Sequence, residues 1–511
     1  MDTYKTRKKI KTLKELALII SKLKKQGKRA VHCHGVFDLM HPGHIRHFEA
    51  AKREGDALVV TITKNIYVNK GPSRPVFDEW LRAEQIAALE CVDYVAINEW
   101  STAEKTIRLL KPNIYAKGSD YEDRKADVTR GIEAEEKAVR FCGGQIHFTR
   151  EIQFSSTGII NEQFDIYPAD ARPFLESFRS RYRDIDIINY LESLKKLKVL
   201  VIGDAIVDEY CYCQPMGKSP KETIVSTRYI KQEAFAGGIL ACANHLAGFC
   251  GTVDLVTALG SKDSRESFIR SHLKPNVTSK FFFRDDASTI IKRRFVDNAF
   301  LAKMFETSYL TDTPINKSLE DKIIKYLNSC AGRYDFVFVA DYGHGFLTPR
   351  IIDVICRKSK FLALNAQTNS SNIGFNLITK YPCADYVCID EPELRLATHA
   401  RYGGLEEMVL YIAKKLKTQK MVSTRGHLGS MAYSRKSGFV SVPVLSQKVV
   451  DRTGAGDAYF SITAPCVVKD FPLEVIGFIG NTVGALAVTI VCNRSSIEPV
   501  TLYKFITTLL H

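Results

Sequence analysis

Two histidines follow an apolar segment near the N-terminus, in the stretch GVFDLMHPGH at residues 35–44. His41 and His44 stand where a strand-like run turns, through Gly43, into a segment with helical spacing. Backbone N–H groups at a helix N-terminus carry partial positive charge, so such a turn can bind phosphate. Both imidazoles can donate hydrogen bonds to one phosphate as charge develops on its oxygens. The spacing indicates phosphate chemistry, although a surface turn is the commoner explanation of a bare HxxH.

A glycine-rich loop far along the chain, TGAGD at residues 453–457, opens an apolar helix. Its N–H groups can form an anion hole for a phosphoryl group in transfer. Asp457 then stands where its carboxylate can accept a proton from an acceptor hydroxyl. An ordinary helix N-cap with an aspartate is a common alternative for a lone GxGD, and the loop alone leaves both interpretations open.

Strand-like and helical segments alternate on both sides of a charged stretch. The first alternation runs from residue 28 to residue 149, and the second starts with KVLVIGDAIVDEY at 198–210. Such alternation is typical of parallel sheets with crossover helices, so we expect two α/β domains. Residues 162–195 are turn-rich, then charged and helical, which suggests a connector. The expected parts are a basic helix at 1–27, a domain at 28–165, a helical linker at 166–195 and a domain at 196–511.

The length and composition are those of an ordinary globular protein with several domains. The chain has 511 residues, of which 45% are hydrophobic and 25% charged, and its length suggests about two to four domains. No apolar run reaches the ~18 residues of a membrane helix, and the first residues lack the apolar core of a signal peptide. The 13 cysteines include no CxxC pair, which favours reduced thiols over a metal site. We therefore expect a cytoplasmic protein without a membrane span.

The net charge of +15 is concentrated near the N-terminus, where residues 1–30 hold eleven Lys or Arg and two acids. Apolar side chains from Leu13 to Leu23 fall on one helical face. We expect this helix to dock by that face and keep its lysines in water. The alternatives are a site for anionic lipid or nucleic acid, and attraction of phosphorylated substrates. No nucleic-acid motif accompanies the lysines, so nucleic acid is not an expected partner.

The first motif resembles GxFDxxHxGH, the signature of the nucleotidyltransferase superfamily. Downstream, NKGPSRPVFDEWLRAEQ, KGSDY and REIQFSSTGII resemble motifs of the ADP-heptose synthase adenylyltransferase domain, in the same order. The resemblance implies a Rossmann-like domain in which a sugar phosphate attacks the α-phosphorus of a nucleoside triphosphate and pyrophosphate leaves. Mg²⁺ would accompany ATP or CTP, and the motif serves both nucleotides.

The same resemblance implies roles for individual residues. His41 and His44 would stabilise the pentacoordinate phosphorus. Asp38 would orient the turn rather than bind metal. Nucleotide binding falls to Gly35, Phe37, Lys70, Arg150, Ser155, Ser156 and Thr157. Further contacts at the substrate fall to Arg82, Lys117 and Asp120.

The second motif, within VVDRTGAGDAYF, resembles the C-terminal signature of the PfkB (ribokinase-like) sugar kinases. That family also opens with a strand ending in GD…D and has a GG turn near the sugar. The resemblance implies a ribokinase-like α/β domain with Asp457 as the catalytic base. The sugar would meet Asp204, Asp208, Gly237 and Gly238. The nucleotide and the anion hole would involve Thr424, Gly426, Gly454, Ala455, Gly456 and Asn481.

Several positions depart from the kinase pattern. The family's GGAANVA is GGILACA here, which puts Ala241 where asparagine is usual, with Asn244 one turn later. The DPKG of heptose kinases is NAQT at 365–368, so an acid and a lysine near the phosphates are missing. DEPE replaces the N-x-x-E that organises magnesium, with Asp390 and Glu393 as indirect Mg²⁺ residues. These departures leave open an altered sugar site or a kinase domain that has become a binding module.

Both halves together resemble bifunctional ADP-heptose synthase with the order of the domains inverted. We expect a bifunctional enzyme that makes an NDP-activated sugar for surface glycans, with ADP-heptose as the leading product. A CTP-dependent enzyme acting on a polyol or glycerol phosphate is the alternative. Relatives of both domains often dimerise, so a homo-oligomer is also expected.

Overall fold

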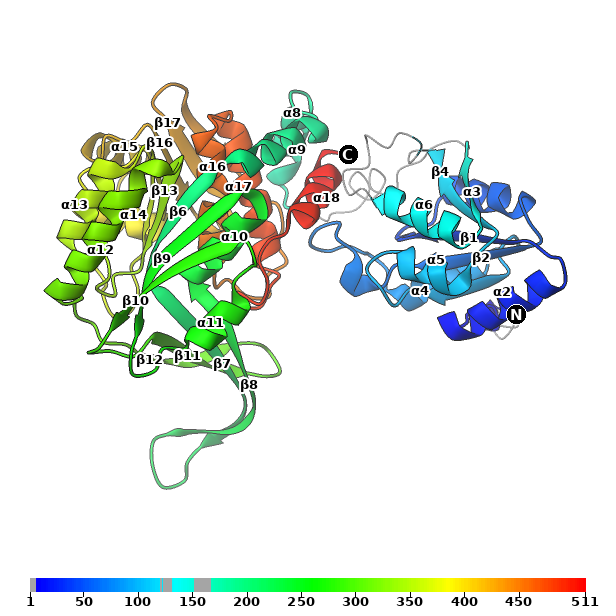
Figure 1. The fold of residues 1–511 in the computed structure, drawn as a ribbon, viewed down its shortest axis with the longest axis horizontal. Coiled ribbons are helices and arrows are strands. Elements are labelled where there is room, and N and C mark those ends of the chain that lie inside the picture. The colour runs from blue at the N-terminus through cyan, green and yellow to red at the C-terminus, as the bar shows by residue number, and fades with distance from the viewer. Residues whose placement is uncertain (1–5, 120–121, 123–130, 151–166) are drawn as a thin grey trace. The chain divides into compact units, whose positions relative to one another are not determined.

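The computed structural model describes residues 6–119, 122, 131–150 and 167–511 and divides into two compact units (Figure 1). Both units have the α/β architecture that the alternating pattern predicts. Unit 1 comprises residues 1–166 with 503–509 and 511, and unit 2 comprises 167–502 with 510.

The described residues of unit 1 form a five-stranded sheet in the order β3-β2-β1-β4-β5, and each neighbouring pair is parallel. Strand β2 is buried along its whole length, as expected of a parallel strand covered on both faces. The strands are β1 (Ala30–Gly35), β2 (Ala57–Ile62), β3 (Tyr94–Ile97), β4 (Ile114–Gly118) and β5 (Gln145–Thr149).

Helices cover both faces of this sheet. Phe48 of α3 and Ile86 of α4 pack into one apolar cluster with β1 and β2. Leu16 of α2 and Ile107 of α5 belong to clusters on the other face, where Val139 of α6 joins them. The helices are α2 (Leu13–Lys25), α3 (Pro42–Arg53), α4 (Glu79–Ala87), α5 (Glu104–Leu110) and α6 (Gly131–Phe141).

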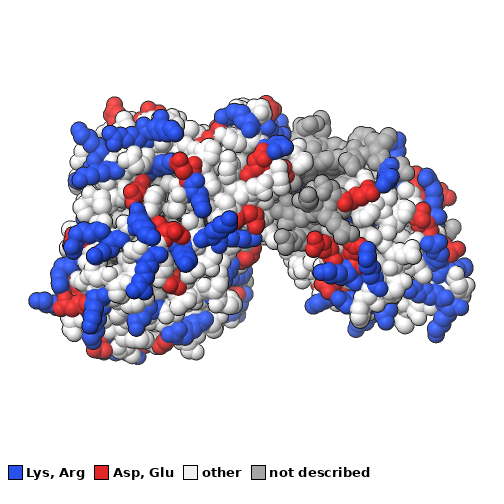
Figure 2. Space-filling model, turned by 45° about the horizontal axis from the view of Figure 1, so that its top comes forward, with Lys and Arg blue, Asp and Glu red and all other residues white. Residues whose placement is uncertain are grey.

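The basic N-terminal helix is α2, and it is part of unit 1 rather than a separate arm. Thr12 and Glu15 form a capping box that fixes its first turn. Leu13, Leu16 and Ile20 are buried against the sheet, and each contributes about 2 kcal/mol relative to exposure. The exposed lysines on its other face are Lys14, Lys22 and Lys25. Figure 2 shows acidic side chains scattered among the basic ones on the visible face of each unit.

The main sheet of unit 2 has the order β10-β9-β6-β13-β14-β15-β16-β17-β18. It is parallel from β10 to β16, and β17 and β18 close it as an antiparallel edge. The strands are β6 (Lys198–Gly203), β9 (Thr252–Gly260), β10 (Val277–Arg284), β13 (Phe336–Asp341), β14 (Leu362–Ala366), β15 (Tyr386–Asp390), β16 (Lys420–Thr424), β17 (Ser430–Ser434) and β18 (Gly438–Val442).

Two helical layers sandwich the main sheet. The layer of α12 to α15 shares one apolar cluster with the strands, and α16 contacts both α10 and α17 on the opposite face. The helices are α10 (Ile239–Phe249), α11 (Glu266–His272), α12 (Lys317–Cys330), α13 (Pro349–Lys358), α14 (Glu391–Thr398), α15 (Leu405–Lys415), α16 (Ala455–Val468) and α17 (Leu473–Ala487), and α18 (Pro499–Leu510) follows them.

A second sheet of unit 2 has the order β12-β11-β7-β8. Its central strand pair is parallel, and the outer pairs are antiparallel. The long β7–β8 hairpin projects from the body of the unit (Figure 1). The strands are β7 (Ala205–Lys218), β8 (Val225–Gly238), β11 (Ile290–Asp297) and β12 (Lys303–Tyr309).

The segment expected to be a linker forms α8 (Ala171–Arg179) and α9 (Asp184–Ser193), which belong to unit 2. The ring of Phe178 stacks on Phe478 of α17 with 4.3 Å between centroids, and Arg181 pairs with Glu474. This amphipathic pair of helices therefore extends the α16–α17 layer.

No helix in the described part of the chain is long and apolar enough to span a membrane. All 13 cysteines are free thiols.

Candidate active sites

The first site lies where β1 and β4 meet in the sheet of unit 1. The chain leaves β1 toward β2 and β3 on one side and reaches β4 and β5 on the other, so this is the topological switch point of the sheet. Ligands of open α/β sheets bind at the carboxyl ends of the strands at such a point. The GVFDLMHPGH stretch begins at the end of β1 and leads into α3, so the fold puts it at the expected place.

His41 and His44 lie face to face at the N-terminus of α3. Their ring centroids are 3.8 Å apart, with 20° between the ring planes. His41 is the N-cap residue, and Pro42 occupies the first helical position, where the lack of an N–H costs no hydrogen bond. Phe37, which has a φ of +49°, packs its ring edge against His44 at 5.2 Å. We call this pair, with Lys70, the histidine site.

Burial disfavours the charged forms of the three side chains in the histidine site. Burial, and then the neighbouring His41, His47 and Lys70, lower the pKa of His44 to about 3. Burial also lowers the pKa of His41 and brings that of Lys70 to about 8. At neutral pH both imidazoles are neutral, so they can donate hydrogen bonds, while the Lys70 ammonium supplies the positive charge. The buried Nδ1 of His44 has no hydrogen-bond partner among the described residues, which suits a site that receives an anionic ligand.

Asp38 ties the turn after β1 to a segment that precedes α4. Its carboxylate accepts hydrogen bonds from the backbone N–H of Val76 at 2.6 Å and of Phe77 at 3.3 Å. Arg74 contributes an ion pair at 3.4 Å, and both side chains are almost fully buried. These bonds fix the turn after β1 against the segment that precedes α4.

Arg82 does not face the histidine site as a substrate contact. Its side chain is fully buried, and its guanidinium spans the turn after β1 and the loop after β2. It donates to the carbonyl oxygens of Val36, Phe77 and Thr63 and to Oδ1 of Asn65, at 2.5–2.9 Å. Four of its five N–H groups are thus bonded within the protein, and Arg82 holds together the segments that carry the site.

Replacing Arg82 with lysine should lower the free energy of unfolding of unit 1 by about 3 kcal/mol, because the ammonium cannot reach all four acceptors and leaves buried carbonyls unpaired. Urea unfolding followed by circular dichroism would measure this loss. The matched control is Arg108→Lys, since Arg108 pairs with Glu104 on the surface of α5 and its guanidinium lies over the Phe141 ring. Equal effects of the two substitutions would contradict the structural role of Arg82.

The remaining expected residues of unit 1 are partly described. Lys117, at the end of β4, is buried and pairs with Glu135 at 3.0 Å. Arg150 is exposed and pairs with Glu122 at 3.0 Å. Gly35 ends β1, and a Cβ there would lie 2.8 Å from the Phe37 ring. Asp120, Ser155, Ser156 and Thr157 lie outside the described residues.

The second site collects side chains that follow five parallel strands of unit 2. Asp204, Tyr342, Gln367, Asp390 and Thr424 stand at or directly after the carboxyl ends of β6, β13, β14, β15 and β16. Carboxyl ends of parallel strands meet at one edge of a sheet, where ligands of α/β proteins bind. The sheet thus assembles polar groups that are far apart in sequence.

Asp204 and Asp208 are both buried at this edge. Burial, and then the nearby Asp341 carboxylate, raise the pKa of Asp204 to about 7. Asp208 pairs with Arg294 at 2.5 Å and lies against Gly237, where a Cβ would stand 1.9 Å from its Oδ2. Gly238, with a φ of +56°, turns the chain from β8 into α10.

Asp457 lies in the first turn of α16, whose N-cap residue Gly454 has a φ of +81°. Its Oδ1 accepts hydrogen bonds from the hydroxyl of Tyr342 at 3.0 Å and from Nε2 of Gln367 at 2.6 Å. Burial raises the pKa of Asp457 to about 6, while these two hydrogen bonds lower it. The carboxylate is therefore ionised at neutral pH and can accept a proton. We call Asp204, Asp208 and Asp457 the aspartate site.

Two basic residues of β11 complete this site and were not found from the sequence. Lys292 and Arg294 share one face of the strand because strand side chains alternate. The Lys292 ammonium interacts electrostatically with Asp208 and Asp204, and it lowers the pKa of Asp457. The sequence has three consecutive basic residues in IIKRRF, and the alternation of a strand puts the first and the third of them on one face.

The loop residues expected at the nucleotide are placed as follows. A Cβ at Gly454 would clash with Asn493 at 2.2 Å, whereas one at Gly456 would meet nothing within 4 Å. Asn481 is buried, and its amide donates to Ser430 and to the carbonyl of Gly477, so it supports α17 from inside. Ala455 starts α16, and Thr424 and Gly426 flank the turn after β16.

Asp390 and Glu393 form a reciprocal capping box at the start of α14. Glu393 also accepts a hydrogen bond from the N–H of Thr368 at 3.1 Å. Burial raises the pKa of both carboxyls. In the described part of the chain, no three His, Cys, Asp or Glu side chains cluster so that they could hold a metal ion. These carboxylates therefore fit contacts to the water shell of Mg²⁺, which this ion usually keeps, better than a direct cage.

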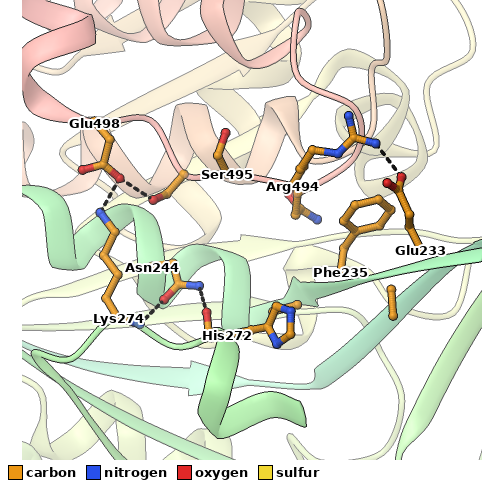
Figure 3. A pocket seen from close by; sticks show the side chains of 12 residues that line it. Glu233, Phe235, Asn244, His272, Lys274, Arg494, Ser495 and Glu498 are labelled. Atoms are coloured by element: carbon orange, nitrogen blue, oxygen red, sulfur yellow. Dashed lines mark hydrogen bonds and ion pairs between the residues drawn. The ribbon is translucent and has the colours of Figure 1, made fainter. Parts of the chain in front are cut away.

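Asn244 does not stand in for the asparagine missing at position 241. Its amide donates to the carbonyl of His272 and accepts from the N–H of Lys274, each at 2.8–2.9 Å. It thereby lines a cavity of about 580 Å³ on a different side of α10 (Figure 3). The charged groups there neutralise one another, since Arg494 pairs with Glu233 and Lys274 pairs with Glu498. This cavity includes none of the three aspartates of the aspartate site.

Comparison with known proteins places a family at each site. Residues 32–162 match the family described as "Cytidylyltransferase-like". The "Bifunctional protein HldE" of Aliarcobacter butzleri is 39% identical over 138 residues, which are 27% of this chain and 29% of that protein. The protein of the same name from Trichlorobacter lovleyi is 42% identical over 115 residues, 22% of this chain and 23% of that one. The chain thus spans less than a third of the length of the curated relatives it matches.

Residues 196–498 match the pfkB family of carbohydrate kinases, which is more than half of the chain. A solved structure of Escherichia coli phosphofructokinase-2 in complex with substrates and products has a TM-score of 0.49 and 12% identity, and the match covers 61% of this chain and 99% of that one. The chain therefore belongs to the pfkB family of carbohydrate kinases and carries a cytidylyltransferase-like domain ahead of the kinase domain.

Proposed function

We propose that this chain is a bifunctional enzyme that makes a nucleotide-activated sugar, with ADP-heptose as the product. The kinase domain phosphorylates a sugar or sugar phosphate, and the transferase domain transfers the nucleoside monophosphate of a triphosphate to a sugar 1-phosphate and releases pyrophosphate. The observation that carries the proposal is the stacked His41–His44 pair beside Lys70 at the switch point. The matches to HldE proteins and to the pfkB family support the pairing of activities.

In the transferase, an oxygen of the sugar phosphate attacks the α-phosphorus, and the bond to the bridging oxygen of pyrophosphate breaks. No covalent enzyme intermediate is needed, so the residues act by position and charge. The neutral imidazoles donate hydrogen bonds to the α-phosphate, and Lys70 and Arg150 hold the triphosphate. Ser155, Ser156 and Thr157 assist, and Mg²⁺ arrives with the nucleotide.

In the kinase, Asp457 takes the proton of the acceptor hydroxyl while that oxygen attacks the γ-phosphorus and ADP leaves. The sugar lies against Asp204, Asp208 and the Gly237–Gly238 turn, and the N–H groups of the 454–456 loop neutralise the phosphoryl oxygens. Lys292 adds positive charge at the same place. Asp390 and Glu393 would contact the water shell of a Mg²⁺ ion that accompanies the nucleotide, and that ion would offset phosphate charge.

A kinase with another sugar specificity is the second candidate, and Asn244 is the observation that favours it. The amide that the family presents from position 241 is missing, and the amide of Asn244 is already occupied by α11 and the loop after it. The sugar pocket is therefore less polar on the side of α10 than in kinases of the family that carry the asparagine. A CTP-dependent transferase acting on a polyol phosphate would accompany such a change.

The homo-oligomer that we expect would use the hairpin of β7 and β8. Its far end exposes large apolar side chains, which are rare on a monomer surface when they are contiguous. They are Met216, Ile224, Val225, Tyr229 and Ile230. Sedimentation of the purified chain, compared with a variant carrying serine at these positions, would test this assembly.

Pyrophosphate release tests the named product. The purified chain would be given ATP, CTP, GTP or UTP with a panel of sugar and polyol phosphates that includes heptose 1-phosphate. We expect release with ATP and heptose 1-phosphate. Release only with CTP, or only with a polyol phosphate, would retain the transferase chemistry and refute ADP-heptose.

Replacing Gly237 with alanine should lower the kinase kcat/KM for its sugar by about 100-fold, because the new methyl group would overlap Asp208 Oδ2 and push that carboxylate off the sugar. Initial rates of ADP formation at varied sugar concentration would measure the loss. Gly484→Ala is the matched control, since its Cβ would meet nothing within 4 Å. Equal rates for the two variants would show that Asp208 does not contact the sugar.

A further inference from the structure

The segment after β14, where the chain departs from the kinase family, is built from uncharged polar residues. Its sequence, NAQTNSSNIGFN at 365–376, contains no acidic or basic side chain. From the sequence alone this departure indicates a loss of catalytic groups. The structure shows a set of hydrogen bonds that converge on Asp457 instead.

Gln367 is fixed by its backbone before its side chain reaches Asp457. Its N–H donates to the carbonyl of Asp341 at 2.9 Å, and its own carbonyl accepts from the amide of Asn376 at 2.9 Å. The side chain then reaches the carboxylate with Nε2 at 2.6 Å from Oδ1. An ionised carboxylate can only accept hydrogen bonds, so the NH₂ group, and not the oxygen, must face it.

Tyr342, the second donor to Asp457, is held by the same segment. The amides of Asn369 and Asn372 both donate to the Tyr342 carbonyl, at 2.7 and 2.9 Å. The buried Tyr342 hydroxyl then donates to Oδ1 of Asp457 at 3.0 Å. Both hydrogen bonds therefore end on one oxygen, and Oδ2 of Asp457 receives none from the described residues.

We propose that Gln367 is a positioning residue for the kinase base, and that together with Tyr342 it holds Oδ1 of Asp457 so that Oδ2 receives the proton of the acceptor hydroxyl. This inference rests on the proposed kinase activity. The asparagines of the 365–376 segment fix the two donors, and the neutral amide supplies the hydrogen bond that orients the base without adding charge beside the phosphates.

The charge at position 367 should shift the acid limb of the kinase pH profile, which is the fall in rate as Asp457 becomes protonated at low pH. Gln367→Glu places a second carboxylate beside Asp457 and should move the limb up by about one pH unit, whereas Gln367→Lys should move it down by a similar amount. Gln367→Ala should lower kcat more than it raises the KM for sugar, and should move the limb slightly upward. The ionisable groups around Asp457 stay constant in these variants; they are Tyr342, Cys242, Cys388, Asp208, Glu393 and Lys292.

The experiment measures kcat and kcat/KM from pH 5 to 9 for the full chain and the three variants, with thermal unfolding of each protein followed by circular dichroism as a folding readout. Gln419→Glu and Gln419→Lys repeat the charge changes at an exposed position of unit 2 and should leave the limb in place. Opposite shifts for glutamate and lysine at 367 alone would establish the proposal. Identical limbs in all variants would overturn it.

A second measurement does not depend on turnover. Titration of ¹³C-labelled aspartate carboxyls by NMR, with the Asp457 signal assigned by Asp457→Asn, reports the same shift directly. If the wild-type chain phosphorylates none of the sugars or sugar phosphates offered with ATP, the proposed kinase activity is refuted. The titration still decides whether Gln367 positions Asp457. An Asp457 signal that titrates identically in the glutamate and lysine variants would sink the inference in either case.

Discussion

Pyrophosphate release should fall by about 100- to 1,000-fold when His44 is replaced with alanine, while sugar phosphorylation stays unchanged. His44 is buried, and its pKa of about 3 makes it a neutral donor at pH 7. Removal of one such donor from a charge-developing oxygen costs this much in comparable sites. The loss should fall on kcat more than on the KM for nucleotide, because the hydrogen bond strengthens as the transition state forms.

His147→Ala is the matched control for this experiment. His147 lies in the same unit on β5 and is partly exposed, and its nearest acidic neighbour is Glu54 at 3.9 Å. It should retain full pyrophosphate release. His44→Gln retains a donor and should recover part of the lost rate. If His44→Ala also abolished phosphorylation, the two activities would depend on one shared site, and the interpretation of two separate sites would be wrong.

The strand–turn–helix motifs were predictable because they are local. GVFDLMHPGH and TGAGD each carry their turn, their helix start and their reacting side chain within about ten residues. The structure confirms the α/β fold around both motifs, and Lys70 lies near enough to the histidine pair to lower the pKa of both rings. Such agreement arises where sequence pattern and backbone geometry are set by the same few residues.

The roles of Arg82 and Gln367 were not predictable, because burial and strand order decide them. Arginine side chains often contact phosphate, yet the guanidinium of Arg82 is enclosed by carbonyl groups from three segments. Gln367 is 90 residues from Asp457 in sequence, and the two meet because β14 ends beside the N-terminus of α16. Similarly, the charged helices of residues 171–193 looked like a linker because the aromatic partner of Phe178 lies about 300 residues further on.

Replacing Asp457 with asparagine should lower the kinase rate by about 100- to 10,000-fold, which is the range for loss of a general base. The amide fills the same space but cannot take the proton of the acceptor hydroxyl. Nucleotide affinity should change little, because the N–H groups of the 454–456 loop remain. Coupled-enzyme detection of ADP with the preferred sugar, together with pyrophosphate release by the same sample, would show the selective loss.

Asp470→Asn makes the same chemical change just after the other end of α16, where the carboxylate is 85% exposed and forms an ion pair with Lys420. It should leave both activities intact, which separates a loss of charge from the loss of a base. The residual rate of Asp457→Asn should also no longer fall below pH 6, because the group with a pKa of about 6 is gone. A variant that kept the acid limb would show that another carboxyl accepts the proton, and Asp208 of the aspartate site would be the next residue to replace.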